Sequence, residues 1–276
     1  MAQSFAHGNY SHTQKNVRNG GGRTPRDRAR RTLSQNFLVD PHAVGRLVKA
    51  ARPSGLVLEP GSGEGVLTRA LAPEVEQIIG YEIDPLLAGK LAARTRGDTR
   101  ISVVRGDFTA ARPPREPFAV VGNIPYSITS RIVDWCLAAP ALTSATLLTQ
   151  LEYARKRSGD FGRWSLVTVE SWPWFSWELL GQVGRESFRP VPSVDSGILR
   201  IERRETPLLP PAAMAGFRAF AELGFGGVGG SLSASLRQRY AKDAVADAFR
   251  AAGLDGSTVV AFVHPDQWVT LYDRLG

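Results

Sequence analysis

Short apolar runs alternate with segments of helical length through the first half of this chain, and this alternation constrains the fold more than any other feature. The apolar runs predict buried strands at Leu56–Glu59, Gln77–Glu82, Ile101–Val104, Phe118–Val121 and Ala145–Thr149. The segments around them predict helices at Val39–Ala51, Gly65–Ala72, Pro85–Arg94 and Ser130–Ala138. Strands that alternate with helices usually form a parallel sheet with crossover helices. We therefore expect an α/β protein with a mostly parallel sheet.

The second half of the chain changes character. Trp177–Val183 and Gly197–Glu202 are strand-like runs, and we expect them to form an antiparallel pair that closes one edge of the sheet. Beyond a proline-rich segment at 206–211 the pattern is helical only, with helices expected at Ala212–Leu223, Ser231–Arg239, Ala241–Ala252 and Pro265–Leu275. These shifts predict a basic arm at 1–31, an α/β domain at 32–204 and a small all-α domain at 205–276.

The N-terminal arm is polar and concentrates positive charge. Its basic residues stand against the single acid Asp27, and they are Lys15, Arg18, Arg23, Arg26, Arg28, Arg30 and Arg31. A segment with so few large apolar side chains is expected to be disordered. Together with the net charge of +8, it indicates a polyanionic partner such as RNA, although a solvated tail without a specific role would have the same composition. Residues 1–14 contain no basic residue, so we do not expect a targeting signal.

Composition excludes several protein classes. The 276 residues can bury a substantial core, and no apolar run reaches the ~18 residues of a membrane helix. The single cysteine, Cys136, excludes an intramolecular disulfide and is expected in the core. The four histidines are dispersed along the chain, so we expect no metal site. We expect a cytoplasmic monomer without a membrane partner.

A glycine-rich loop and two acids follow successive predicted strands. The loop Pro60–Gly65 reads Pro-Gly-Ser-Gly-Glu-Gly, and its G-x-G-x-G spacing argues against a pyrophosphate cradle. Glu82 ends the next strand, where it can accept both hydroxyls of a ribose beside the apolar Ile83. After the third strand, Asp107 can accept an adenine amine and Phe108 can line its ring. Each acid alone would be interpreted first as a helix N-cap, but their joint placement after successive strands favours a nucleoside ligand.

The sequence Asn-Ile-Pro-Tyr at 123–126 suits methylation of an exocyclic amine on a nucleobase. The lone pair of such an amine is delocalised into the ring, so a catalyst must localise it and align it with a methyl donor. The side-chain oxygen of Asn123 and the carbonyl of Ile124 can accept the two N–H bonds, and Tyr126 can stack on the base. Pro125 holds Ile124 out of the helical region, which aims these carbonyls. Asn-x-Pro also occurs in ordinary strand-to-turn corners.

Residues 32–276 resemble the ribosomal-RNA adenine-N6 methyltransferases, whose donor is S-adenosylmethionine. The matching motifs are Gln35-Asn36-Phe37-Leu38, the glycine loop 59–65, Glu82, Asp107-Phe108 and Asn123–Tyr126. The resemblance implies a Rossmann-like methyltransferase domain with a mostly parallel sheet, followed by a helical RNA-binding domain. The donor site that it implies contains Gln35, Asn36, Leu38, Gly61, Gly63, Glu82, Ile83, Asp107, Phe108 and Asn123.

Within that family, Ile124 and the stretch from Gln150 to Ser165 resemble the Erm enzymes of actinomycetes. This resemblance implies N6-methylation of one adenine of 23S rRNA in the peptidyl-transferase region, and resistance to macrolides, lincosamides and streptogramin B. Phe188 matches an aromatic residue that is expected to face Tyr126 across the target base, although a core aromatic would read the same. We expect the RNA contacts to come from Arg26, Arg28, Arg30, Arg31, Arg131, Arg155, Lys156, Arg157, Arg163, Arg237 and Arg239.

Two other functions fit the same motif order. One is dimethylation of adjacent adenines in 16S rRNA during ribosome assembly, a branch in which leucine usually replaces Ile124. The other is a non-catalytic nucleic-acid-binding relative of the same fold, which the intact Asn123, Tyr126 and glycine loop argue against. A DNA adenine methyltransferase fits less well, because its motif has Asp or Asn followed by Pro-Pro. The sequence leaves open whether one or two methyl groups are added.

Overall fold

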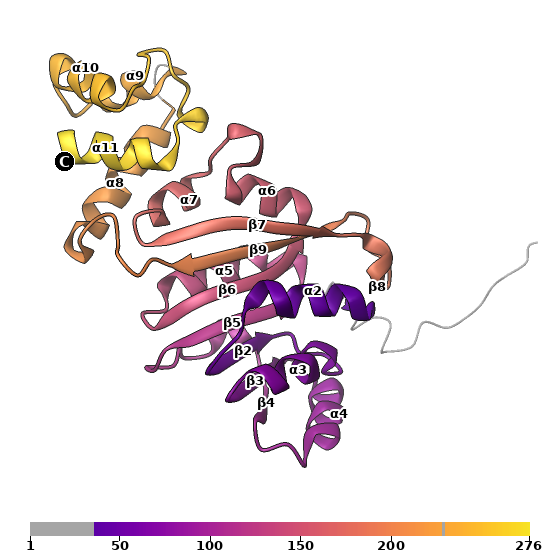
Figure 1. Ribbon diagram of the computed structural model, residues 1–276. Helices are drawn as coiled ribbons and strands as arrows, with labels where there is room; N and C mark the ends of the chain where they lie inside the picture. The colour runs from indigo at the N-terminus through magenta and orange to yellow at the C-terminus, as the bar shows by residue number, and fades with distance from the viewer. Residues whose placement is uncertain (1–35, 228–229) are drawn as a thin grey trace, which may run out of the picture. The chain divides into compact units, whose positions relative to one another are not determined.

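The computed structural model describes residues 36–227 and 230–276, and these described residues belong to one compact unit. A seven-stranded sheet runs through it in the order β4-β3-β2-β5-β6-β9-β7 (Figure 1). The strands are β2 (Leu56–Pro60), β3 (Gln77–Glu82), β4 (Ile101–Arg105), β5 (Phe118–Asn123), β6 (Leu142–Gln150), β7 (Phe175–Val183) and β9 (Ser196–Arg203). Strands β2 to β6 pair in parallel, whereas β9 is antiparallel to both β6 and β7. The parallel sheet and the antiparallel pair at its edge are confirmed.

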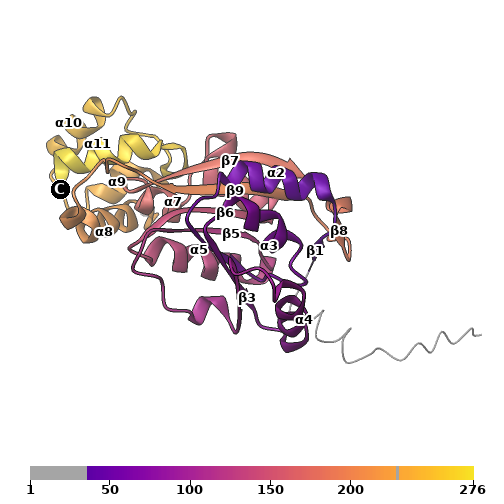
Figure 2. The same cartoon turned by 60° about the horizontal axis from the view of Figure 1, so that its bottom comes forward.

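Helices cover both faces of the sheet. They are α2 (Pro41–Ala51), α3 (Val66–Leu71), α4 (Pro85–Thr95), α5 (Thr129–Ala138), α6 (Leu151–Ser158) and α7 (Leu166–Ser171). Helices α2 and α3 lie on one face of the sheet and α5 on the other (Figure 2). Neighbouring strand residues enter different core clusters: Val120 packs with α5, whereas Val121 packs with α2 and α3. This follows from the two-residue period of a strand, which sends successive side chains to opposite faces. Cys136 on α5 is fully buried, as expected.

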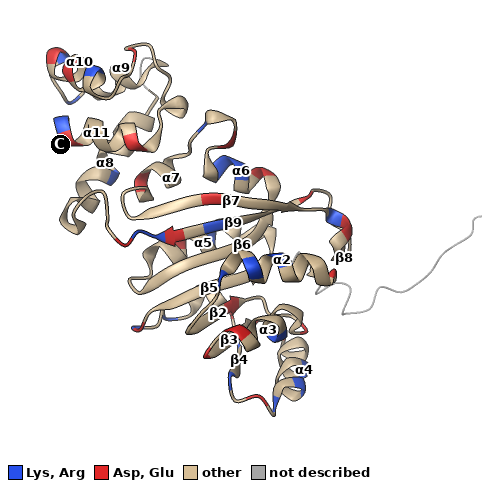
Figure 3. Ribbon diagram, viewed as in Figure 1, with Lys and Arg blue, Asp and Glu red and all other residues tan. Residues whose placement is uncertain are grey.

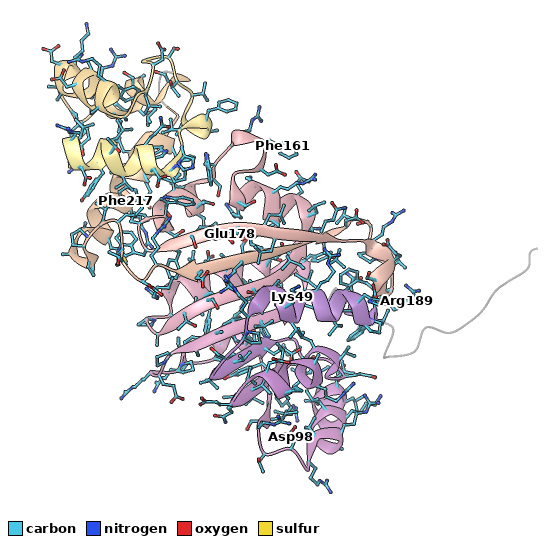
Figure 4. All side chains as sticks on the ribbon, viewed as in Figure 1. Lys49, Asp98, Phe161, Glu178, Arg189 and Phe217 are labelled. Carbon is cyan, nitrogen blue, oxygen red and sulfur yellow. The ribbon has the colours of Figure 1, made fainter. Side chains whose placement is uncertain are left out.

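The helices after residue 204 share a hydrophobic cluster with one face of the sheet. They are α8 (Met214–Phe225), α9 (Leu232–Leu236), α10 (Lys242–Ala251) and α11 (Pro265–Leu275). Phe217 on α8, labelled in Figure 4, and Trp268 on α11 are fully buried in this cluster, and the Phe217 ring lies 6.2 Å from that of Trp174. In the described part of the chain no strand follows Arg203, so the helical pattern is confirmed. The domain boundary at 204 stays a prediction.

Some elements were not predicted. Two-residue strands β1 (Phe37–Leu38) and β8 (Phe188–Arg189) pair antiparallel and bring segments about 150 residues apart into contact. Helix α6 is too highly charged to show an apolar stripe, and α7 is short. Helix α2 begins later than expected, because Asp40 caps it and Pro41 occupies its first turn. None of the described helices is long and apolar enough to cross a membrane.

Candidate active site at the carboxyl edge of the sheet

The predicted site residues converge because parallel strands end at the same edge of a sheet. The glycine loop follows β2, Glu82 ends β3, Asp107 follows β4 and Asn123 ends β5, and these four strands are neighbours in the sheet. The N–H groups of Gly61 and Ser62 donate to the carbonyl of Tyr81, which ties the loop to the adjacent strand. The structure therefore brings the glycine loop, Glu82, Asp107 and Asn123 to one edge.

The backbone of the loop itself explains its glycines. Gly61, Gly63 and Gly65 have φ angles of 71°, 56° and 79°, in the left-handed region where other residues are strained. A Cβ at Gly63 would lie 3.2 Å from the ring of Phe37, and one at Gly65 would lie 2.2 Å from Leu91. A Cβ at Gly61 would lie 3.9 Å from the carbonyl oxygen of Asn123. The loop thus presents bare backbone beside the catalytic motif.

The carboxylate of Glu82 holds this loop in place. It accepts 2.8 Å hydrogen bonds from the N–H groups of Gly63 and Asp84. Its burial, with only 1% of the residue exposed, raises the pKa of Glu82, and the two hydrogen bonds act against that rise. The neighbouring Ile83 is 48% exposed and offers an apolar surface at the same edge. The group expected to bind a ribose is therefore also the anchor of the glycine loop.

Asp107 caps the turn that follows β4. It accepts from the N–H and hydroxyl groups of Thr109, both at 2.8 Å, and the guanidinium of Arg131 lies 3.5 Å from it. Burial raises the pKa of Asp107, but these hydrogen bonds and the Arg131 charge outweigh it and leave the pKa lowered. Phe108 is buried between Tyr81 and Trp135, with ring centroids 5.3 and 4.4 Å away. Its ring face is therefore taken by the core, so its lining of an adenine stays a prediction.

The predicted catalytic motif, Asn123–Tyr126, is held by contacts distant in sequence. Nδ2 of Asn123 donates a 2.8 Å hydrogen bond to the carbonyl of Asn36, and the hydroxyls of Tyr126 and the fully buried Ser196 lie 2.7 Å apart. Burial raises the pKa of Tyr126, against the effect of the Ser196 hydrogen bond. The side chain of Ile124 is in the core, and the ring of Pro125 faces Gly61.

Phe188 lies in the core in this structure. It is fully buried, and β8 pairs it with Leu38 of β1, which is also buried. Its ring is fully covered in this structure, so the expected stacking on the target base stays a prediction. Gln35, the remaining donor-site residue predicted from the sequence, lies outside the described residues.

The predicted RNA-binding residues occupy several places. Arg155 and Lys156 lie on α6, and Arg163 lies in the turn after it, whereas Arg237 and Arg239 are exposed after α9. Figure 3, in which Lys and Arg are blue, shows basic residues on α6. Arg131 lies instead beside the donor site, where it donates to the hydroxyl of Thr109 at 2.6 Å. Arg157 is partly buried and donates to Ser165. The arm residues Arg26, Arg28, Arg30 and Arg31 lie outside the described residues.

Two polar groups near the site were not predicted. Glu59, at the end of β2, is 2% exposed and accepts a 2.5 Å hydrogen bond from the hydroxyl of Thr68. Burial raises its pKa to about 8, and the nearby Glu82 contributes to that rise. The sequence could have indicated Glu59, because this acid stands directly before the glycine loop. Ser196 had no such signal, because only the folded chain brings it to Tyr126.

In the described ranges, no three His, Cys, Asp or Glu residues are grouped as metal ligands would be.

Comparisons with known proteins agree with this geometry. The family model described as ribosomal RNA adenine dimethylase matches residues 26–276. An rRNA adenine N-6-methyltransferase of Streptomyces fradiae is 58% identical over 252 residues, which cover 90% of this chain and 79% of the relative. The mycinamicin-resistance protein MyrB of Micromonospora griseorubida is 36% identical over 251 residues, covering 90% and 80%.

Among solved structures, the 23S rRNA methyltransferase ErmE superposes with a TM-score of 0.83 at 52% identity. The match covers 87% of this chain and 99% of that one. The glycine loop, the acids of β3 and β4 and the motif at 123–126 therefore lie in a methyltransferase fold. This chain belongs to the ribosomal RNA adenine dimethylase family.

Proposed function

We propose that this protein methylates the N6 amine of one adenine in 23S rRNA, in the peptidyl-transferase region, and thereby confers resistance to macrolides, lincosamides and streptogramin B. The observation that carries the proposal is the position of Asn123–Tyr126, at the end of β5 and against the glycine loop, in a chain 52% identical to a 23S rRNA methyltransferase. The similarity to a mycinamicin-resistance protein supports the resistance phenotype.

The residues at the sheet edge fit S-adenosylmethionine. Gly61 leaves the backbone bare beside Asn123, where a Cβ would lie 3.9 Å from the carbonyl oxygen of Asn123. The carboxylate of Glu82 accepts two backbone N–H groups, and a carboxylate has about four acceptor positions, so ribose hydroxyls can share it. Asp107, with its lowered pKa, is an ionised acceptor suited to an adenine amine. When bound, the donor supplies an electrophilic methyl group.

The protein's own contribution is to hold the target amine in position. We assign the two N–H bonds of the amine to Oδ1 of Asn123 and the carbonyl oxygen of Ile124, which localises the nitrogen lone pair for in-line attack. The ring of Tyr126, fixed through its hydroxyl to Ser196, stacks on the base. The adenine must leave its own stack to enter, as RNA bases recognised in loops do. The proton lost from the product passes to water, so no general base is required.

Mass-spectrometric mapping of rRNA from cells that express the protein tests the proposal. We expect a methylated adenine in 23S rRNA and raised resistance to a macrolide, and neither in cells that express Asn123→Ala. The modified nucleotide will also show whether one or two methyl groups are added. Methylation confined to adjacent adenines of 16S rRNA would instead identify a ribosome-assembly enzyme. No transfer of tritiated methyl to either rRNA would leave the non-catalytic alternative.

A further inference from the structure

Two exposed phenylalanines lie on one surface between the sheet and the C-terminal helices. Phe161 is 73% exposed in the turn between α6 and α7, where Figure 4 labels it, and Phe262 is 50% exposed at the end of the turn Val260–Phe262. In the described ranges they are the exposed phenylalanines. The N–H of Trp164 donates to the carbonyl of Ala261 at 2.8 Å, which joins the two turns.

An arginine lies over each of these rings. The guanidinium carbon of Arg155 is 5.4 Å from the ring centroid of Phe161, and that of Arg163 is 5.1 Å from the ring centroid of Phe262. Arg155 is itself held 3.0 Å from the carboxylate of Asp160. We call the four residues Arg155, Phe161, Arg163 and Phe262 the aromatic platform. It combines flat apolar surfaces with positive charge, the chemistry that binds single-stranded nucleic acid.

Phe161 is exposed in a turn whose backbone conformation is strained at this residue. Its φ of 65° is in the left-handed region, between Gly159 at 74° and Gly162 at 65°. The carboxylate of Asp160 accepts from the N–H of Phe161 at 3.0 Å and fixes the turn. A bulky side chain is disfavoured in this conformation, and a glycine at this position would avoid the strain. A ring that is 73% exposed in a strained turn contributes little to the packing of the fold.

The platform is connected to the catalytic edge through α6. In the sheet, Asn123 of β5 pairs with Leu148 of β6, and α6 begins at Leu151, directly after that strand. Eight helical residues, a length of about 12 Å, lead from there to the turn of Phe161. Along this path α6 presents Arg155 and the exposed Lys156. A nucleotide strand with its adenine at Asn123 would therefore meet cations and then aromatic rings.

We propose that the aromatic platform stacks unpaired bases of the rRNA substrate that flank the target adenine. This inference rests on the proposed function and adds a second contact region to it. Stacking does not depend on base identity, because every base has a flat π face, whereas recognition of the adenine itself belongs to the catalytic motif. The two regions together would hold a single-stranded segment across the surface that α6 provides.

Substitutions at the two rings test the proposal with a 23S rRNA fragment that contains the target adenine. Phe161→Leu and Phe262→Leu keep apolar volume but remove the ring, and each should raise the Kd and the KM for RNA about 5- to 100-fold, with kcat at saturating RNA and donor affinity unchanged. Phe161→Trp and Phe262→Tyr, which keep an aromatic ring, should bind RNA about as tightly as the wild type. Leu208→Ala, at a leucine 43% exposed before α8, is the matched control and should bind as wild type.

Phe161→Gly separates function from folding. It should raise Tm, because the left-handed backbone is relaxed, and weaken RNA binding at the same time. A purely structural residue would not give opposite changes. An unchanged Kd in the Phe161→Leu, Phe262→Leu double variant would overturn the platform, and would point to a protein partner for this surface. Failure of the proposed function would give a different result. The wild type would then leave the 23S fragment unmethylated, whereas the Kd for RNA would still show whether the two rings bind it.

Discussion

Nδ2 of Asn123 lies 2.8 Å from the backbone carbonyl oxygen of Asn36 and donates a hydrogen bond to it. A carbonyl only accepts, so this contact fixes which end of the carboxamide is nitrogen. Oδ1 is then the free acceptor end of Asn123 at the sheet edge. The segment that the resemblance assigned to the donor site thus also orients the residue assigned to the target amine.

Asn123→Ala should abolish methyl transfer while leaving donor affinity nearly unchanged. The alanine removes the acceptor for the amine and the hydrogen bond to Asn36, but it leaves in place the glycine loop, Glu82 and Asp107, which are expected to make most of the donor contacts. We expect kcat to fall about 100-fold or more, as when a preorganised polar contact to the reacting group is lost. Tritiated-methyl incorporation into a 23S fragment and calorimetric titration of the donor measure the two effects. Turnover near wild type would refute the role of Asn123.

Asn123→Asp is a sharper test of the Asn36 contact. It keeps the size and the acceptor oxygens of Asn123 but places a carboxylate oxygen against the carbonyl of Asn36. Two acceptors repel, so the side chain should rotate and turnover should fall nearly as far as in the alanine variant. Retained activity in Asn123→Asp would mean that the amide orientation does not matter.

Tyr126→Phe and Ser196→Ala should have similar and non-additive effects. Each removes the hydrogen bond between the two hydroxyls, which lie 2.7 Å apart, but leaves the ring of Tyr126 able to stack. We expect each to cost about 0.5–1.5 kcal/mol in transition-state stabilisation, up to roughly tenfold in kcat. The kcat of the double variant should be no lower than that of the less active single variant. Additive losses would show that Ser196 acts independently of Tyr126.

Phe188→Leu separates the two possible roles of this buried aromatic. Phe188→Ala would remove about 3–5 kcal/mol of stability through a core cavity, which would obscure any effect on RNA. Leucine keeps most of the packing and should cost less than about 1.5 kcal/mol in unfolding free energy. If Phe188 stacks on the base, the leucine variant should still lose about 1–3 kcal/mol in RNA engagement. A normal kcat and KM would leave Phe188 as a core residue.

Glu59→Gln should make stability less dependent on pH. Burial raises the pKa of Glu59 from 4.5 to about 8. The neutral buried carboxyl therefore stabilises the fold fully below pH 4.5, and this contribution is lost as the pH rises toward 8. Since the amide stays neutral, the variant should gain stability over wild type across this window, by at most about 5 kcal/mol.

Urea unfolding at pH 5 and pH 8 measures the difference. The amide oxygen can still accept from Thr68, so the hydrogen bond at Glu59 is kept. Glu74→Gln, at an exposed carboxyl after α3, is the matched control and should follow the wild-type profile. A constant difference between Glu59→Gln and wild type at both pH values would contradict the prediction.

The local sequence pattern was enough to predict most strands and helices of the α/β region. The bounds of β3 at Gln77–Glu82 and of α11 at Pro265–Leu275 agree with the sequence, because apolar periodicity and proline at the first helical turn are local signals. The convergence of Glu82, Asp107 and Asn123 followed as well, since parallel strands must end at one edge. The sequence by itself thus determined the fold class and the sheet edge at which the candidate site residues meet.

Only the tertiary structure decided how the site is held. The contacts of Asn123 with Asn36 and of Tyr126 with Ser196 join residues 87 and 70 positions apart, and no local pattern encodes such pairs. The same is true of Phe188, which is fully buried and pairs with the distant Leu38 across β1 and β8. Composition and spacing report what a residue can do, whereas burial and partners are set by the packing of distant segments.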